Sequence, residues 1–196
     1  MKKWSEIKQV TLDKLFLTEA EARQQGYLAK FRYLANEGLN IIANGVKPRI
    51  AAFKFSVVAD DVEKTNDEYH LSDIVTMPED FLSFADLINY HNNKPWNDIV
   101  YLSDTDFVVG ELGDYVVYYN ATWDNITEED ITNNTELTTH VSVINCLPTY
   151  IASQLLSQDD VQRSAILKNE FELMLSRLDT NILYQENHYQ SSGGWY

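Results

Sequence analysis

The chain has 196 residues, 44% of them hydrophobic, with 8 Phe, 12 Tyr and 4 Trp, and its net charge is −15. This composition fits one domain, or one domain with an insertion, around a full hydrophobic core, and excludes a disordered polar chain. The single cysteine, Cys146, excludes an internal disulfide and is expected to be a small core residue. No apolar run reaches membrane-spanning length and no secretory signal is recognisable, so we expect a cytosolic protein or a particle assembled there.

The charge is unevenly distributed along the chain. Residues 1–54 hold ten Lys/Arg against five Asp/Glu, a net of +5, whereas residues 55–196 carry a net of −20. An acidic surface of this kind disfavours nucleic-acid binding. Two interpretations stay open: a solvated surface, which is the commoner case, or copies whose basic end contacts the acidic flank of a neighbour.

The first part of the chain predicts three helical segments. Residues 4–17 are amphipathic, and Thr18 with Glu21 three residues later matches a capping box that starts a second segment. From Tyr27 onward, apolar side chains recur at spacings of three and four, which predicts a longer helix. Gly38 lies on that apolar stripe, where the missing side chain would let another backbone come close.

The middle of the chain, residues 49–136, predicts an inserted β domain. Apolar residues alternate over residues 51–59, and further short strands are expected up to Ala121, with Asn-, Asp-, Gly- and Pro-containing turns between them. Residues 77–81 read as a loop. Strands at this spacing predict an antiparallel sheet or small sandwich, and an acidic connector over residues 124–136 leads back to the helices.

A pair of helices over residues 138–179 is expected to complete the helical core. Pro148 lies inside the first apolar run and predicts a bend there. Asp159 and Asp160 suit the start of the second helix, where the dipole favours negative charge. The apolar residues of that second helix are expected to face the core; they are Val161, Ile166, Leu167, Phe171, Met174, Leu175 and Leu178.

The end of the chain has a different character. Residues 181–196 have no helical period, yet they contain four aromatic residues, which are Tyr184, Tyr189, Trp195 and Tyr196. Aromatic side chains on a Ser/Gly-rich arm predict anchors for a partner, and a tail folded back onto its own sheet is an equally open alternative. The predicted fold class is α+β: a helical core from residues 1–48 and 137–180, an inserted antiparallel sheet or sandwich over 49–136, and an extended C-terminal arm over 181–196.

No motif in the sequence predicts chemistry. The histidines lie at positions 70, 91, 140 and 188, without metal-ligand spacing, and neither a phosphate-binding glycine loop nor a nucleophilic serine turn is present. We therefore expect no catalytic residue, no cofactor and no metal ion.

Several short sequences in a fixed order resemble a known family. They are Trp4-Ser5-Glu6-Ile7, Ala35-Asn36-Glu37, Tyr118-Tyr119-Asn120-Ala121, residues 147–155 followed by Asp159-Asp160, Asn169-Glu170-Phe171-Glu172, and Gly194-Trp195-Tyr196. In this order the chain resembles the head–tail connector (adaptor, or neck) proteins of tailed bacteriophages over nearly its full length, with little contribution from residues 50–115. The resemblance implies a non-enzymatic structural virion protein that forms a ring of about twelve copies and extends the DNA channel.

The resemblance also implies the partners and the location. The partners would be the capsid portal protein, a downstream neck or tail protein and neighbouring copies of the chain, with double-stranded DNA passing through without specific binding and no membrane. The protein would be assembled in the host cytoplasm and located in the neck of the virion. The alternative is a non-catalytic ligand- or carbohydrate-binding module of a phage tail, with Trp96 and Trp123 stacking on sugar rings. A third hypothesis is a small hydrolase, which would need clustered carboxylates with perturbed pKa values.

Overall fold

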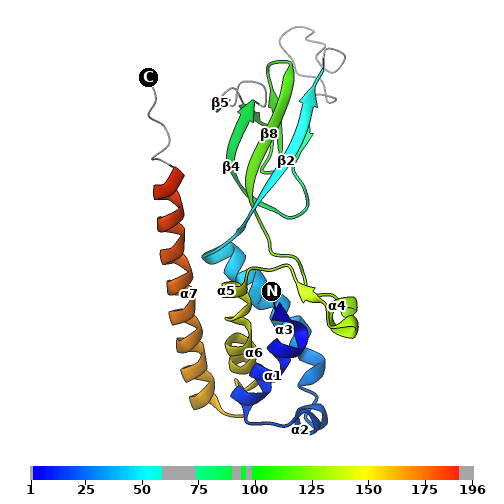
Figure 1. The fold of residues 1–196 in the computed structure, drawn as a ribbon, viewed down its shortest axis with the longest axis vertical. Coiled ribbons are helices and arrows are strands. Elements are labelled where there is room, and N and C mark those ends of the chain that lie inside the picture. The colour runs from blue at the N-terminus through cyan, green and yellow to red at the C-terminus, as the bar shows by residue number, and fades with distance from the viewer. Residues whose placement is uncertain (1, 59–73, 90–93, 96–98, 190–196) are drawn as a thin grey trace. The chain divides into compact units, whose positions relative to one another are not determined.

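The chain divides into two units, which we describe separately. The computed structural model describes residues 2–58, 74–89, 94–95 and 99–189, and within this set it describes the side chains of residues 2–58, 74–89 and 99–178. One unit comprises Met1–Pro48 and Trp123–Tyr196 and consists mainly of helices; the other comprises Arg49–Thr122 and consists of strands (Figure 1). The protein is therefore of the predicted α+β class.

The helical unit is organised around one buried helix. Its elements are β1 (Lys2–Lys3), α1 (Trp4–Leu15), α2 (Glu19–Gln24), α3 (Leu28–Gly45), α4 (Glu128–Asn133), β9 (Glu136–Leu137), α5 (Val141–Ile144), α6 (Leu147–Leu155) and α7 (Val161–Tyr189). The side chains of α6 are buried on all sides, with Gln154 the exception, and α1, α3 and α7 pack against it. A helix that is apolar all round requires such a cover.

At Gly38, α3 lies directly against side chains of α6. A Cβ atom at this position would lie 2.9 Å from Cδ1 of Tyr150 and 3.2 Å from Cδ2 of Leu147. The Tyr150 ring also packs against the Phe171 ring of α7, with 5.0 Å between the ring centroids. The predicted close approach is therefore present, but the partner is an aromatic ring rather than a backbone segment.

The β unit is a small antiparallel sandwich. Its strands are β2 (Arg49–Val57), β3 (Val75–Thr76), β4 (Phe81–Asn89), β5 (Lys94–Pro95), β6 (Ile99–Tyr101), β7 (Asp106–Val109) and β8 (Gly113–Ala121). One sheet has the order β2-β8-β4-β5 and the other has the order β3-β7-β6. Side chains from both sheets form one hydrophobic cluster that includes Leu87, Phe107 and Tyr115. The expected antiparallel insertion is present.

Strand β4 is longer than the sequence predicts. It starts at Phe81, a residue that we assigned to a loop, and it pairs with β8 along most of its length. Two register shifts, between Phe81 and Ser83 and between Phe84 and Asp86, interrupt its alternation. These bulges place the apolar residues Phe81, Phe84 and Leu87 three apart instead of two apart, which hides the strand from a period-2 search.

Pro148 does not bend one long helix as expected. The chain forms two helices, α5 and α6, and Pro148 occupies the first turn of α6. N–H groups in the first turn have no acceptor within the helix, so a proline there costs no helical hydrogen bond. His140 caps α5, because its Nδ1 accepts from the backbone N–H of Ser142. Proline therefore starts a helix here instead of kinking one.

The prediction of which α7 residues face the core is only partly correct. Leu167, Phe171 and Leu178 are buried, and Leu175 is half-buried, but Val161 and Ile166 are exposed. Ile166 and Leu167 are adjacent, so they project about 100° apart around the helix and cannot both face α6.

The predicted non-helical arm over 181–196 is wrong for its first part, because α7 continues to Tyr189. Once a helix is formed, each further residue adds one backbone hydrogen bond, so a segment without an apolar period can extend it. Residues 190–196 lie outside the described residues. No helix in the described part of the chain is long and apolar enough to cross a membrane.

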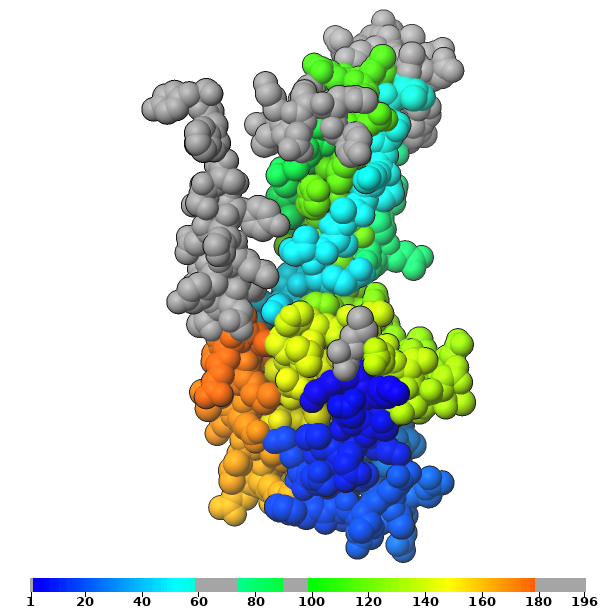
Figure 2. All heavy atoms as spheres, in the orientation of Figure 1, coloured from blue at the N-terminus to red at the C-terminus, as the bar shows by residue number. Residues whose placement is uncertain are grey.

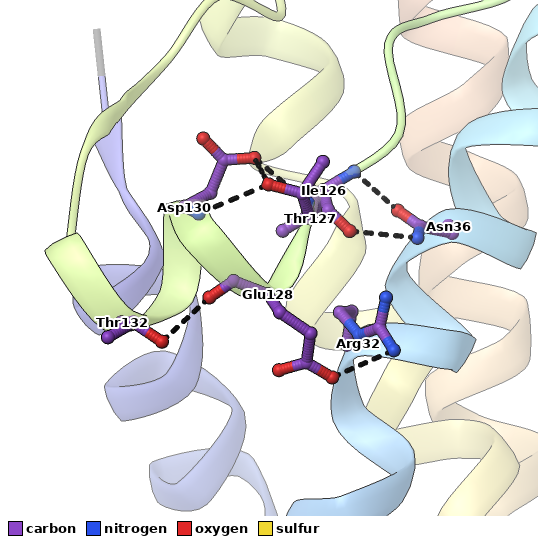
Figure 3. Close-up of polar contacts among 7 residues, drawn as sticks. All are labelled: Arg32, Asn36, Ile126, Thr127, Glu128, Asp130 and Thr132. Carbon is purple, nitrogen blue, oxygen red and sulfur yellow. Dashed lines mark hydrogen bonds and ion pairs between the residues drawn. The ribbon is translucent and has the colours of Figure 1, made fainter.

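The insertion ends at Thr122 rather than at residue 136. Trp123 is buried in the helical unit, and its indole Nε1 donates to the carbonyl oxygen of Lys47 at 2.8 Å. Asn36 of α3 donates from Nδ2 to the Ile126 carbonyl oxygen at 3.1 Å and accepts from the Ile126 N–H at 2.8 Å (Figure 3). These bonds attach the connector to α3, so it belongs to the helical unit.

Candidate interaction faces of the helical unit

Arg163 of α7 holds the C-terminal end of α1. Its guanidinium donates to the carbonyl oxygens of Lys14 and of Leu15, the latter at 3.4 Å, and so satisfies acceptors that a helix end leaves without partners. The same group lies 4.1 Å from the centroid of the Phe16 ring. Phe16 has a left-handed backbone, with φ of 57°, directly after α1. Arg163 therefore fixes both the helix end and the orientation of the aromatic ring.

Large apolar side chains lie exposed along this seam. Phe16 is 83% exposed, Ile166 is 64% exposed and Leu173 is 58% exposed. Ile166 follows Arg163 by three residues and Leu173 follows Ile166 by seven, so the three α7 residues share one side of the helix. On the same seam, Lys14 of α1 and Glu170 of α7 form an ion pair, with 2.7 Å between Nζ and Oε1. We call the surface formed by Phe16, Arg163, Ile166 and Leu173 the α1/α7 face; Figure 2 shows α1 in dark blue beside the orange atoms of α7.

A second exposed surface follows the outer side of α3. It surrounds an open hollow of about 460 Å³ whose described lining residues are Arg32, Tyr33, Asn36, Glu37, Asn40, Ile41 and Asn44. Tyr33 is 72% exposed and Ile41 is 41% exposed. These two residues lie eight apart, on one side of the helix with Glu37 between them. We call the surface formed by these lining residues the α3 face.

The α4 segment borders the α3 face. Arg32 pairs with Glu128 at 2.9 Å, and Thr127 caps α4 through a reciprocal set of bonds with Asp130 (Figure 3). The bonds from Thr127 and Thr135 lower the pKa of Asp130, because they stabilise its charged form. Asn134, which has a left-handed backbone, accepts from the N–H of Ser5 at 3.0 Å. The connector is thus fixed to both α1 and α3.

At least half of the ten basic residues in the first 54 positions form ion pairs within their own chain. Within the described part of the chain, the ion pairs include Lys8–Glu19, Lys14–Glu170, Arg23–Glu19, Arg32–Glu128 and Arg49–Asp80. Every cation among them comes from residues 1–54. The predicted contact between a basic end and an acidic flank of separate copies therefore stays a prediction, and much of that basic charge already serves the fold.

The predicted site residues are placed only in part. Tyr184 and Tyr189 belong to the backbone of α7, but their side chains lie outside the described set. Trp195 and Tyr196 lie outside the described residues altogether. The prediction that these aromatic residues anchor a partner stays untested.

Cys146 has the predicted core position. It is buried at the start of α6, its Sγ donates to the Ser142 carbonyl oxygen, and burial raises the pKa of the thiol to about 11. A thiol with so high a pKa is protonated at neutral pH and is a poor nucleophile.

Buried aromatic residues bear on the carbohydrate-binding alternative. Trp123 is buried and hydrogen-bonded, so it offers no open ring for a sugar. Trp96 lies outside the described residues. In the β unit, Phe107, Tyr115 and Tyr119 are buried in the cluster, whereas Tyr101 is exposed at its edge.

Among the described side chains, no group of three or more His, Cys, Asp or Glu residues is arranged to hold a metal ion. The Asp106 carboxylate accepts hydrogen bonds from the Ser103 and Thr76 hydroxyls, and these bonds lower its pKa. It serves the turn between β6 and β7.

In comparisons with known proteins, no family model and no curated protein matches the chain.

The sequence did not single out the α1/α7 face or the α3 face. It placed Ile166 among the residues expected to face the core, it included Phe16 only within the amphipathic residues 4–17, and it recorded Tyr33 only as part of the aromatic total. A helical projection would have found Ile166, because Leu167, Phe171 and Leu178 already fill the buried side of α7. No sequence signal shows that Arg163 stacks on Phe16.

Proposed function

We propose that this chain is a structural protein of tailed-bacteriophage particles, one subunit of a ring between the capsid portal and the tail that extends the DNA channel. The family resemblance of its short sequences motivates the proposal. One structural observation supports it: the helical unit exposes large apolar side chains in two separate places, on the α1/α7 face and on the α3 face.

Two different faces are what a ring subunit requires. In a closed ring with rotational symmetry, each copy contacts its two neighbours through two different surfaces. The α1/α7 face and the α3 face belong to different helices that cover α6, so contact through one leaves the other available. Exposed apolar side chains that gather on one surface mark interaction sites, whereas single scattered ones are common on monomeric proteins.

The net charge of −15 sets the conditions for assembly. Copies of like charge repel each other in dilute buffer at low salt, so we expect monomers or weak association there. Ions screen this repulsion, because the Debye length falls from about 30 Å at 0.01 M to about 3 Å at 1 M. Self-association should therefore increase with salt, and the portal would align copies within the particle.

Cryo-electron microscopy of intact particles tests the proposal. The expected result is a ring of this chain directly beneath the portal, around the DNA channel. A particle proteome that lacks the chain, or density that places it on a tail fibre or receptor-binding tip, would overturn the connector function. The second of these outcomes would favour the ligand-binding alternative.

A further inference from the structure

We propose that the α1/α7 face of one copy binds the α3 face of a neighbouring copy, with the Phe16 ring in the hollow of α3 and Arg163 opposite Glu37. This contact rests on the proposed ring and names the two surfaces that would form it. The occupant of each face is thus a second copy of this chain.

Phe16 is a preorganised anchor. A left-handed backbone is unfavourable for a residue with a Cβ, and Phe16 retains it while most of its ring is exposed to solvent. Arg163 bonds the two preceding carbonyl oxygens and stacks on one side of the ring. A side chain that is already fixed loses little entropy on binding. Phenylalanine is enriched in protein interfaces, and arginine is among the commonest binding hot spots.

The α3 face has room for an aromatic ring. Its described lining residues all belong to α3, and the hollow of about 460 Å³ beside them is open to solvent and large enough for a phenyl ring. Tyr33 and Ile41 supply apolar surface along its length, and the Asn36, Asn40 and Asn44 amides supply polar surface. An inserted ring could pack against the Tyr33 ring at the separations that aromatic pairs prefer.

The charges of the two faces are complementary. On the α1/α7 face Lys14 is paired with Glu170, and on the α3 face Arg32 is paired with Glu128. Among the described side chains, no carboxylate lies within ion-pair distance of Arg163 and no cation lies within that distance of Glu37. Within that set, Arg163 and Glu37 thus each lack an oppositely charged partner, although the Glu37 carboxylate neighbours the Tyr150 hydroxyl of its own chain. Between copies that each carry −15, opposite charges favour this pairing over others.

The contact is head-to-tail, because it joins two different surfaces. A dimer formed through it keeps one unused α1/α7 face and one unused α3 face, so further copies can add until the ring closes. A contact between two α1/α7 faces would instead stop at a dimer. This difference makes the proposal testable by mixing variants.

The experiment uses the full chain at about 1 M salt, where repulsion is screened, and measures sedimentation velocity. Phe16→Asn removes the ring while keeping a residue that tolerates the left-handed backbone, and Tyr33→Ala disables the α3 face. The matched control is Leu112→Asn, an exposed apolar residue of the β unit. Wild type and control should form species larger than dimers. Each face variant alone should be monomeric, and their equimolar mixture should form dimers only, because each mixed pair retains one intact face of each kind.

A charge variant tests the same contact independently. Glu37→Lys would place two cations opposite each other, and should weaken association about tenfold or more at about 0.15 M salt, with a smaller effect at about 1 M. Association of either face variant like the wild type, or a mixture that stays monomeric, would overturn the proposed contact. So would a wild-type chain that stays monomeric at every salt concentration. These sedimentation results test only the contact between the two faces, so a ring of this chain seen in particles would stand whatever their outcome. Absence of the chain from particles would overturn the connector function and would leave the sedimentation test of the contact unaffected.

Discussion

The side-chain amide of Asn36 forms both available backbone hydrogen bonds of Ile126, donating to its carbonyl oxygen at 3.1 Å and accepting from its N–H at 2.8 Å. A single side chain thus replaces the pairing that a neighbouring strand would supply. The bonded residue is buried, so its polar groups have no access to water as an alternative partner. This contact fixes the point at which the chain returns from the β unit to the helices.

Replacement of Asn36 by alanine should lower the free energy of unfolding by about 2–3 kcal/mol, because two buried backbone groups lose their partner. Urea denaturation followed by far-UV circular dichroism measures this. Asn40→Ala is the matched control: Asn40 lies one turn further along α3, is exposed, and should change stability by less than about 0.5 kcal/mol. Equal effects of the two variants would contradict the assigned role of Asn36.

Gly38→Ala should destabilise the protein by about 1 kcal/mol. The new Cβ would lie 2.9 Å from the Tyr150 ring, which is itself packed against Phe171, so the helix-propensity gain of about 1 kcal/mol is outweighed by overpacking of about 1–3 kcal/mol. At Gly45, the last residue of α3, an added Cβ meets no atom within 4 Å. Gly45→Ala should therefore be neutral or stabilising. Thermal melting of the two variants side by side measures the difference, and a stabilised Gly38→Ala would show that α3 and α6 are not so closely packed.

Neighbouring residues of α7 should respond oppositely to truncation. Leu167 is buried against the core, so Leu167→Ala should cost about 2–4 kcal/mol through lost burial and a residual cavity. Ile166 is exposed, and Ile166→Ala should change stability by less than about 0.5 kcal/mol. Chemical denaturation of both variants tests the rotation of α7 about its axis. A costly Ile166→Ala combined with a tolerated Leu167→Ala would mean that the opposite side of α7 faces α6.

Stability should fall at alkaline pH. Burial, and next the neighbouring Glu37 carboxylate, raise the pKa of Tyr150 above its usual value near 10. Above pH 10 the unfolded chain loses this proton while the folded chain keeps it, so the free energy of unfolding decreases as pH rises. Burial and Asp80 raise the pKa of Tyr119 in the same direction, and a hydrogen bond to Asp159 raises that of Tyr27.

The Tyr150→Phe variant isolates the contribution of Tyr150. It removes the titrating hydroxyl while keeping the ring against Gly38, so its urea midpoint should fall less steeply between pH 9 and pH 11 than that of the wild type. Parallel slopes for the wild type and Tyr150→Phe would show that Tyr150 does not retain its proton.

The sequence determined the features that depend on local spacing. The capping box of Thr18 and Glu21 forms as predicted and starts α2, and the apolar stripe of α3 is buried at Phe31, Ala35, Leu39 and Ile42. The alternation of β2 likewise predicted a strand, which the structure confirms from Arg49 to Val57. Hydrogen bonds between close neighbours and a regular apolar period suffice for such features, because both are set within one or two turns of chain.

Only the tertiary structure decided which apolar residues are left uncovered and where the units divide. Whether Ile166 or Leu167 faces inward depends on the direction from which α6 approaches, and whether Trp123 belongs to the sheet or to the helices depends on the Lys47 carbonyl, 76 residues away. The cation–π contact between Phe16 and Arg163 joins residues that are far apart in the chain. Such pairs are fixed by the packing of helices against each other, and a single sequence does not encode that packing in any local spacing.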